Sequence, residues 1–320
     1  MKLLRDGRLV AFATETVYGL GADATSSAAV RRIYAAKGRP PTNPCIVHVS
    51  SEAVARRYAT KWPAACAKLA EALWPGPLTL VVEKIAAIVP EATAGRGTVA
   101  LRVPNHPLAL ALLRAFDGPI AAPSANRSGR VSPTTAEHVR RELGDRVDMV
   151  LDGGPCEVGI ESTVLDLSGE QPVILRPGGV SRQRIEELIG PVDVRDAVVA
   201  ADEAAASPGM AAVHYSPTAP MFRFEAGEIQ KVVDWTRRHP GQRMALLVPV
   251  GRTLPPELSE GEGHLILAMP TTPTDYARML YAALHNADVE EVLAIWAQLP
   301  PDEPAWTPVR DRMTRASNLP

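Results

Sequence analysis

Along residues 9–190 the chain alternates short apolar runs with longer amphipathic segments. Runs of five to seven residues that are rich in Val, Ile and Leu are typical of strands. We therefore expect strands at eight places, which are residues 9–14, 45–49, 78–84, 98–103, 119–124, 148–152, 162–167 and 172–176.

Three longer segments between these runs predict helices, at residues 27–38, 133–144 and 181–190. Each begins at or just after a serine, whose hydroxyl can cap a helix, and each ends at a glycine, which tolerates the left-handed backbone of a helix end. Strands that alternate with helices indicate an α/β domain, which we place at residues 1–195.

Residues 196–220 interrupt this alternation with an alanine-rich stretch and then a proline-broken polar stretch. Such a segment is typical of a linker, and we expect it to act as a lid. The alternation then restarts, and residues 221–320 predict a smaller three-layer α/β domain, Rossmann-like, with a mostly parallel sheet. Its helices are expected at residues 228–239, 274–287 and 309–316, and its strands at 244–250, 264–269 and 290–298.

Composition narrows the class of protein. Hydrophobic residues make up 46% of the 320 residues, which is typical of a globular protein, and the formal charge of −2 argues against a broad basic face for nucleic acid. The separated cysteines Cys45, Cys66 and Cys156 predict neither disulfides nor a zinc site. The N-terminus does not resemble a signal peptide, and no apolar run suits a membrane helix, so we expect a cytoplasmic protein without a membrane partner.

Two polar segments suit a nucleotide. Lys37 and Arg39 stand at a helix end before a proline-stiffened loop with Asn43, and we expect this pair of cations to bind phosphate oxygens from a surface loop. A solvated helix end is the alternative. Residues 121–134 form a loop of small residues before a helix, which suits phosphates or is a plain surface loop. Its neutral donors and acceptors are Ser124, Asn126, Ser128 and Ser132.

Other polar positions leave two interpretations open. Residues 13–23 place hydroxyls and a glutamate beside Gly19 and Gly21, which suits either a small polar ligand or a capping turn. Arg102 lies four residues after Thr98 on one strand, and a buried arginine needs either a buried carboxylate or a substrate carboxylate. His48 stands between valines, which is typical of a satisfied core histidine. With neither a Ser-His-Asp order nor a Walker loop, the sequence favours binding and alignment over nucleophilic catalysis.

Seven motifs occur in order across the first 180 residues, namely TETVYGLG, KGRPPTNPCIVHV, LWPGPLT, LRVPNHP, APSANRSG, GIESTVLD and LRPGG. Together they resemble the YrdC-like family. The added C-terminal domain, after a PGM…HYSP segment, resembles that of the two-domain threonylcarbamoyl-AMP synthases. The resemblance implies a twisted-sheet domain with a large concave cavity in which two substrates meet.

The resemblance also implies the role of each matching position. The threonine side of the cavity would be Thr16, His48, Arg102, Ala122 and Ser162. The ATP side would be Lys37, Arg39, Asn43, Thr98, Ser124, Asn126, Ser132 and Arg176, with His214, Tyr215 and Ser216 of the linker closing over the nucleotide. Lys37 and Arg39 would be the catalytic cations. The chain departs from the family at Ala13, where proline is usual, and after Met210, where basic residues are common.

The implied function is that of a nucleotidyltransferase, which joins L-threonine, bicarbonate or CO2, and ATP into L-threonylcarbamoyl-AMP and pyrophosphate. Mg2+ would come with ATP, without side-chain ligands from the protein. A separate tRNA threonylcarbamoyl transferase would use the product to modify the adenosine beside the anticodon, and a weak direct contact with tRNA stays open. The alternatives are an RNA-binding module with a basic cavity, which the near-neutral charge disfavours, and a carbamoyl-adenylate-dependent transferase that acts on another acceptor.

Overall fold

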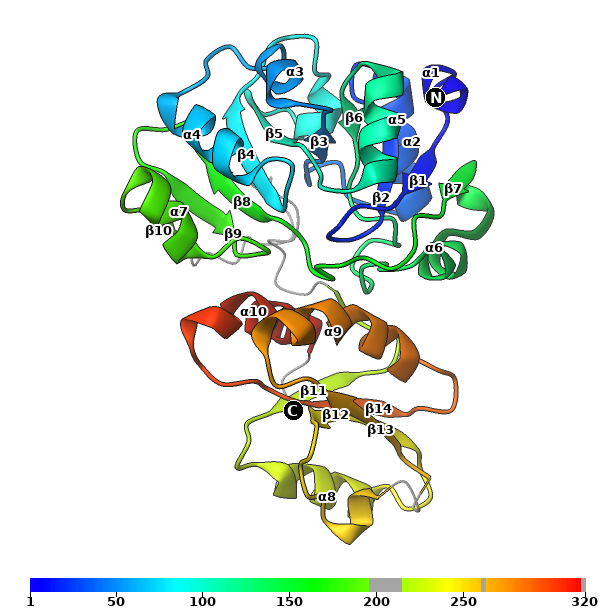
Figure 1. Cartoon of the computed structure of the whole chain (residues 1–320). Helices are drawn as coiled ribbons and strands as arrows, with labels where there is room; N and C mark the ends of the chain where they lie inside the picture. The colour runs from blue at the N-terminus through cyan, green and yellow to red at the C-terminus, as the bar shows by residue number, and fades with distance from the viewer. Residues whose placement is uncertain (196–214, 260–262, 318–320) are drawn as a thin grey trace. The chain divides into compact units, whose positions relative to one another are not determined.

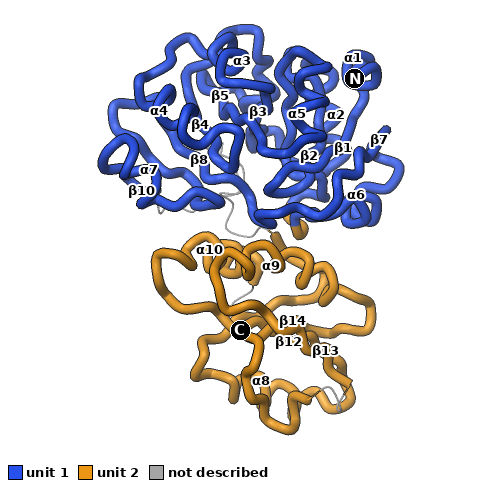
Figure 2. The backbone as a smooth tube through the Cα atoms, viewed as in Figure 1, with its two compact units in different colours: residues 1–128, 132–212 blue, residues 129–131, 213–320 orange. Residues whose placement is uncertain are grey.

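The structure, a computed structural model, describes residues 1–195, 215–259 and 263–317. It divides into two compact units, the first comprising residues 1–128 and 132–212 and the second comprising residues 129–131 and 213–320 (Figure 2). Of the expected linker at residues 196–220, the part from 196 to 214 lies outside the described residues. The domain boundaries proposed from the sequence therefore stay a prediction.

A ten-stranded mixed sheet forms the centre of the first unit, in the order β10-β9-β8-β4-β5-β3-β6-β2-β1-β7 (Figure 1). Its strands are β1 (Val10–Phe12), β2 (Gly19–Asp23), β3 (Ile46–His48), β4 (Leu78–Glu83), β5 (Thr98–Arg102), β6 (Ile120–Ala121), β7 (Met149–Leu151), β8 (Thr163–Asp166), β9 (Val173–Arg176) and β10 (Asp193–Val194). Its α-helices are α1 (Lys2–Arg5), α2 (Ser27–Lys37), α3 (Glu52–Arg56), α4 (Ala64–Leu73), α5 (Pro107–Phe116), α6 (Ala136–Leu143) and α7 (Arg182–Ile189).

Each of the eight strands expected in this part of the chain is present, in shortened form. The turn expected at residues 13–23 is only half correct, because its second part forms β2. Glycines hide this strand from a propensity argument, yet one of them is required by packing: a Cβ on Gly21 would lie 2.8 Å from the ring of Phe12. The sequence argument also missed α4 and α5. The helix α5 has the sequence PLALALLRAF, in which apolar residues on almost every side obscure the helical period.

Helix ends follow local rules. The side chain of Ser26 accepts a hydrogen bond from the backbone of Ala29 at the start of α2, and Gly38 ends the helix with a left-handed φ of 61°. The expected start of the second helix was too early, because Thr135 caps α6. A side chain that accepts a hydrogen bond from one of the first free N–H groups therefore marks where α2 and α6 begin.

Alternation along β1 shows how the layers form. Ala11 belongs to the large core that also contains Ile33 of α2 and Leu69 of α4. Phe12 points to the opposite face, where it packs with Leu113 of α5. The helices α2 and α4 thus cover one face of the sheet, and α5 covers part of the other.

The second unit confirms the predicted small α/β domain with a parallel sheet. Its strands are β11 (Met221–Phe224), β12 (Met244–Pro249), β13 (Leu265–Met269) and β14 (Ala294–Gln298), in the order β11-β14-β12-β13 with every pair parallel. Its α-helices are α8 (Ile229–Arg238), α9 (Pro273–Ala287) and α10 (Thr307–Ala316). The sequence argument missed β11. In the described part of the chain, no helix has the length and apolarity needed to cross a bilayer.

Candidate functional site

Strand directions bring several of the predicted threonine residues to one edge of the first sheet. His48 and Arg102 are paired neighbours at the ends of the parallel strands β3 and β5. Because β4 runs antiparallel to β5 and parallel to β8, the starts of β4 and β8 lie at that same edge. There the Thr79 and Ser162 hydroxyls are hydrogen-bonded at 2.8 Å. Residues distant in sequence thus meet because the sheet is mixed.

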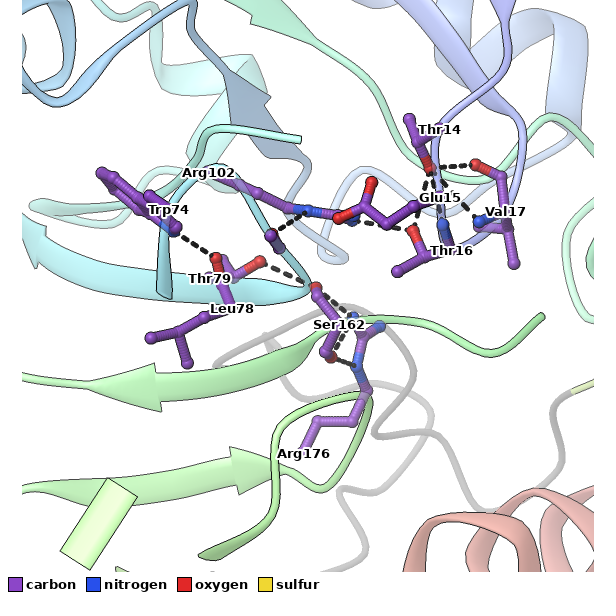
Figure 3. A network of polar contacts seen from close by, with 11 residues as sticks. Thr14, Glu15, Thr16, Val17, Trp74, Leu78, Thr79, Arg102, Ser162 and Arg176 are labelled. Atoms are coloured by element: carbon purple, nitrogen blue, oxygen red, sulfur yellow. Dashed lines mark hydrogen bonds and ion pairs between the residues drawn. The ribbon is translucent and has the colours of Figure 1, made fainter. Parts of the chain in front are cut away.

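Arg102 is the centre of this edge (Figure 3). Its Nη1 donates to Oγ1 of Thr16 at 2.9 Å, and its Nε donates to the carbonyl of Gly76 at 3.2 Å. Its Nη2 lies 2.7 Å from Oε1 of Glu15, and each of these two side chains is only 4% exposed. The sequence left open whether a buried carboxylate or a substrate carboxylate faces Arg102. The structure supplies the carboxylate of Glu15.

The turn before β2 presents Glu15 and Thr16 to Arg102. Oγ1 of Thr14 accepts hydrogen bonds from the backbone N–H groups of Thr16 and Val17 and donates to the carbonyl of Val17 at 2.6 Å. A threonine hydroxyl that bonds its own following backbone fixes a turn. Ala13, at the position where the resemblance leads one to expect proline, is fully buried. Side-chain hydrogen bonds therefore order this turn.

Arg176 and Ser162 are joined although the resemblance assigns them to different substrates. Nη2 of Arg176 donates to the carbonyl of Ser162 at 2.9 Å and to its Oγ at 3.3 Å (Figure 3). Ser132, another predicted ATP residue, donates from Oγ to the buried carboxylate of Glu161 at 2.7 Å, directly before Ser162 in the chain. Residues predicted for threonine and residues predicted for ATP are thus neighbours in the fold.

His48 is a buried neutral imidazole. Burial, and then the positive charge of Arg102, lower its pKa to about 3. Its ring stands edge-on to Phe12, and its Nδ1 is buried without a hydrogen-bond partner among the described residues. A backbone hydrogen bond with Ile46 partly offsets this lowering of the pKa, so His48 is only partly the satisfied core histidine that the sequence indicated. A buried nitrogen without a hydrogen-bond partner in the protein is free to form a hydrogen bond with a ligand.

Lys37 connects the two segments that were expected to bind phosphates. Its Nζ donates to the carbonyls of Ser124 at 2.6 Å and Asn126 at 2.5 Å, and it lies 3.3 Å from Oδ1 of Asn126. Burial, followed by the charge of Arg39, lowers the pKa of Lys37 well below its usual value. The expected surface loop is wrong, because Lys37 is 3% and Arg39 is 6% exposed.

The remaining predicted ATP residues have partners other than Lys37. Arg39 donates to the carbonyls of Asn43 and Pro44, and Oδ1 of Asn43 is buried without a hydrogen-bond partner in the described structure. Thr98 begins β5, whereas Arg102 ends it, so the strand rise of ~3.3 Å per residue separates them by about 13 Å. The structure does not bring these two residues together.

Ala122 and the described linker residues complete the set. Ala122 is buried, and its N–H donates to the carbonyl of Ile46 at 2.8 Å. Tyr215 lies in the second unit, where its ring packs against Tyr281 and below the guanidinium of Arg312. The N–H of Ser216 donates to the carbonyl of Gly129, which belongs to the same unit. His214 lies outside the described residues, so the role of this segment stays a prediction.

Sequence reasoning gave no specific role to three polar members of this edge, which are Glu15, Thr79 and Glu161, although it placed Glu15 in a segment that suits a small polar ligand. Each stands within or beside a motif whose neighbour was selected. The available signal was the rule that a buried cation needs an anion, which pointed to a carboxylate without saying which one.

Comparisons with known proteins match both parts of the chain. A family model described as "telomere recombination" matches residues 2–178, and one described as "threonylcarbamoyl-AMP synthase, C-terminal domain" matches residues 180–318. The threonylcarbamoyl-AMP synthase of Pyrococcus abyssi is 39% identical over 98% of this chain and 92% of its own length. That of Bacillus subtilis is 50% identical over 68% of this chain, and the match spans 64% of the relative.

A solved structure shares the fold of both units. The crystal structure of P. abyssi Sua5 complexed with L-threonine matches 99% of this chain and 92% of its own chain, with a TM-score of 0.90 and 37% identity. Escherichia coli YciO matches 57% of this chain with a TM-score of 0.51 and 21% identity, which supports only the fold. The α/β class expected for both parts of the chain is confirmed.

Proposed function

Because the chain belongs to the threonylcarbamoyl-AMP synthase family, an enzyme family, we propose that it makes L-threonylcarbamoyl-AMP from L-threonine, bicarbonate or CO2, and ATP, with release of pyrophosphate. The observation that carries this proposal is the buried Arg102 at the sheet edge, beside the hydroxyl of Thr16 and the neutral imidazole of His48. A guanidinium binds a carboxylate, and neutral polar groups suit a small hydroxylated amino acid. The threonine complex of the P. abyssi relative supports the choice of amino acid.

The proposed reaction needs no side-chain nucleophile. The neutral amine of threonine attacks CO2 or bicarbonate, and the N–C bond so formed gives an N-carboxylate. With CO2 the amine loses a proton, and with bicarbonate that proton leaves within the departing water molecule. This carboxylate attacks the α-phosphorus of ATP, and pyrophosphate leaves. The protein has to hold the carboxylate against the phosphorus and stabilise the charge on the phosphates. The Arg39 and Arg176 guanidiniums are the proposed phosphate partners.

Lys37 has a different part in this proposal from the one expected. Three oxygen atoms of Ser124 and Asn126 already surround its ammonium group. We therefore propose that Lys37 shapes the loop at residues 124–126 for the nucleotide, and that any contact it makes with phosphate comes in addition.

The predicted ATP residues are cations, amides and hydroxyls, which suit phosphate oxygens. We propose that Mg2+ enters as part of the ATP substrate, and we assign it no protein ligand. The product would pass to a tRNA threonylcarbamoyl transferase, and a cytoplasmic location fits that hand-over.

One assay separates the proposed function from its alternatives. The purified chain is incubated with ATP, threonine, bicarbonate and Mg2+, pyrophosphate is followed, and each component is omitted in turn. The proposal expects pyrophosphate and a threonylcarbamoyl-AMP mass only in the complete mixture. An RNA-binding module would release none, and a transferase for another acceptor would not depend on threonine. Either result would contradict the proposal.

A further inference from the structure

Glu15 has a side chain that the proposed reaction leaves without a role. The residue is 3% exposed, and its Oε1 lies 2.7 Å from Nη2 of Arg102. Neither of its carboxylate oxygens accepts an aligned hydrogen bond from the described residues, and Nη2 of Arg102 donates none. A buried carboxylate is normally met by several donors, since an unmet charged group is costly to bury. This ion pair is therefore close but incompletely satisfied.

The fold around Glu15 does not need the carboxylate. The hydroxyl of Thr14 closes the turn, and the carbonyl of Glu15 accepts a hydrogen bond from the N–H of Val158 at 2.7 Å. Both bonds fix the backbone whatever side chain stands at this position. A buried ion pair with open hydrogen-bonding positions is also weak evidence for a stabilising role.

We propose that Glu15 accepts the α-amino group of the amino-acid substrate, so that Glu15 and Arg102 together bind the zwitterion. An α-amino acid carries its ammonium and its carboxylate on one carbon atom, and Glu15 and Arg102 present the complementary charges side by side (Figure 3). Nε and Nη1 of Arg102 already donate hydrogen bonds to Gly76 and Thr16. The substrate carboxylate would therefore bind at Nη2, beside Glu15. This inference rests on the proposed function and deepens it.

The role of Glu15 is one of binding and specificity. It selects an α-amino acid over an α-hydroxy acid, because a hydroxyl in place of the ammonium brings no charge to the carboxylate. After the ammonium has lost its proton, the amine can still donate a hydrogen bond to Glu15, which would hold the nitrogen in place for its attack on carbon.

The test compares two ligands in two proteins. Binding of L-threonine and of 2,3-dihydroxybutyrate, in which a hydroxyl replaces the amino group, is measured by titration calorimetry or ligand-observed NMR for the wild type and Glu15→Gln. We expect Glu15→Gln to weaken threonine binding by about tenfold or more, the size of a charge-assisted hydrogen bond, and to leave the hydroxy acid within about twofold. Glu52→Gln, a carboxylate on α3 that is paired with Arg56, is the matched control and should change neither.

Two results would overturn the inference. If both ligands weaken alike, Glu15 only braces Arg102, since both ligands carry the carboxylate that Arg102 binds. If threonine binding does not change, Glu15 has no contact with the ligand. A wild type that binds neither ligand would instead contradict the proposed function itself.

A second variant covers the case in which Glu15→Gln does not fold, as judged by circular dichroism. Glu15→Asp keeps the charge and withdraws it by one methylene. It should lower the preference for threonine over the hydroxy acid by about threefold or more, and an unchanged preference would contradict the inference.

Discussion

The two units share the arrangement of helices packed on a sheet, but they differ in how many ionisable side chains they bury. At the sheet edge and around the loop at residues 124–126, the first unit buries several ionisable side chains, namely Glu15, Lys37, Arg39, His48, Arg102, Glu161 and Arg176. Among the described residues of the second unit, the core is built on side chains such as Phe224, Leu246 and Trp296. The buried ionisable side chains there are fewer, namely His264, His285 and Arg312, and Arg312 pairs with the adjacent Asp311. Burying charge costs free energy that packing does not return, so its concentration in the first unit indicates a binding site.

The two units should also differ in how substitutions change stability and ligand binding. The second unit is built around an ordinary apolar core, and substitutions in that core should lower the free energy of unfolding. In the first unit, the same kind of substitution should disturb folding and ligand binding together. The following predictions use this difference, beginning with the largest expected effect.

A cavity in the second unit should lower stability without touching the amino-acid site. Leu246 of β12 is fully buried, and Leu246→Ala should reduce the free energy of unfolding by about 2–5 kcal/mol. Leu80→Ala on β4 of the first unit is the matched variant. Thermal unfolding and threonine titration are measured for both. If Leu246→Ala lowers threonine affinity as much as Leu80→Ala does, the separation of roles is wrong.

Removing Lys37 should affect both activity and folding. Lys37→Ala takes away the ammonium group that holds the carbonyls of Ser124 and Asn126, so adenylate formation should lose about 2–4 kcal/mol of transition-state stabilisation, and the melting temperature should fall. Lys84→Ala, which removes a lysine that donates to the carbonyl of Ile88, is the control. Equal turnover in the two variants would argue against a role for Lys37 in shaping the nucleotide loop.

Acid should destabilise the first unit through His48. Its pKa falls from 6.5 to about 3 on folding because of burial and then Arg102, so the folded state favours the neutral ring. This contribution to stability is complete above pH 6.5 and declines towards pH 3, by up to about 1.4 kcal/mol per pH unit. Unfolding curves of the wild type and His48→Gln at several pH values measure it. Parallel pH dependences in the two proteins would contradict the assignment.

Local features were the part that the sequence predicted well. The Ser26 cap and the Gly38 terminator of α2 depend on a few neighbouring residues, and both were found where they were expected. The contact between Glu15 and Arg102 depends on strand pairing between distant segments, and neither residue alone reveals its partner. The burial of Lys37 was missed for the same reason, because the carbonyls that surround it come from a loop almost ninety residues later.

The family pattern located the site residues as a set but could not say what they contact. It grouped Arg176 with ATP and Ser162 with threonine, whereas the two are hydrogen-bonded to one another. The strand β2 shows a similar limit, since its glycines argue against a strand until the packing of Phe12 against Gly21 is known. Tertiary contacts decided both cases.

The most direct test of the account is titration of L-threonine and of ATP into the wild type and Arg102→Lys. Lysine keeps the charge but loses the planar fork that bonds Thr16 and Gly76. The buried-charge account predicts that threonine binding weakens at least about tenfold while ATP binding stays within about twofold. Equal weakening of both ligands, or unchanged threonine binding, would contradict the claim that this edge of the first sheet is the amino-acid site.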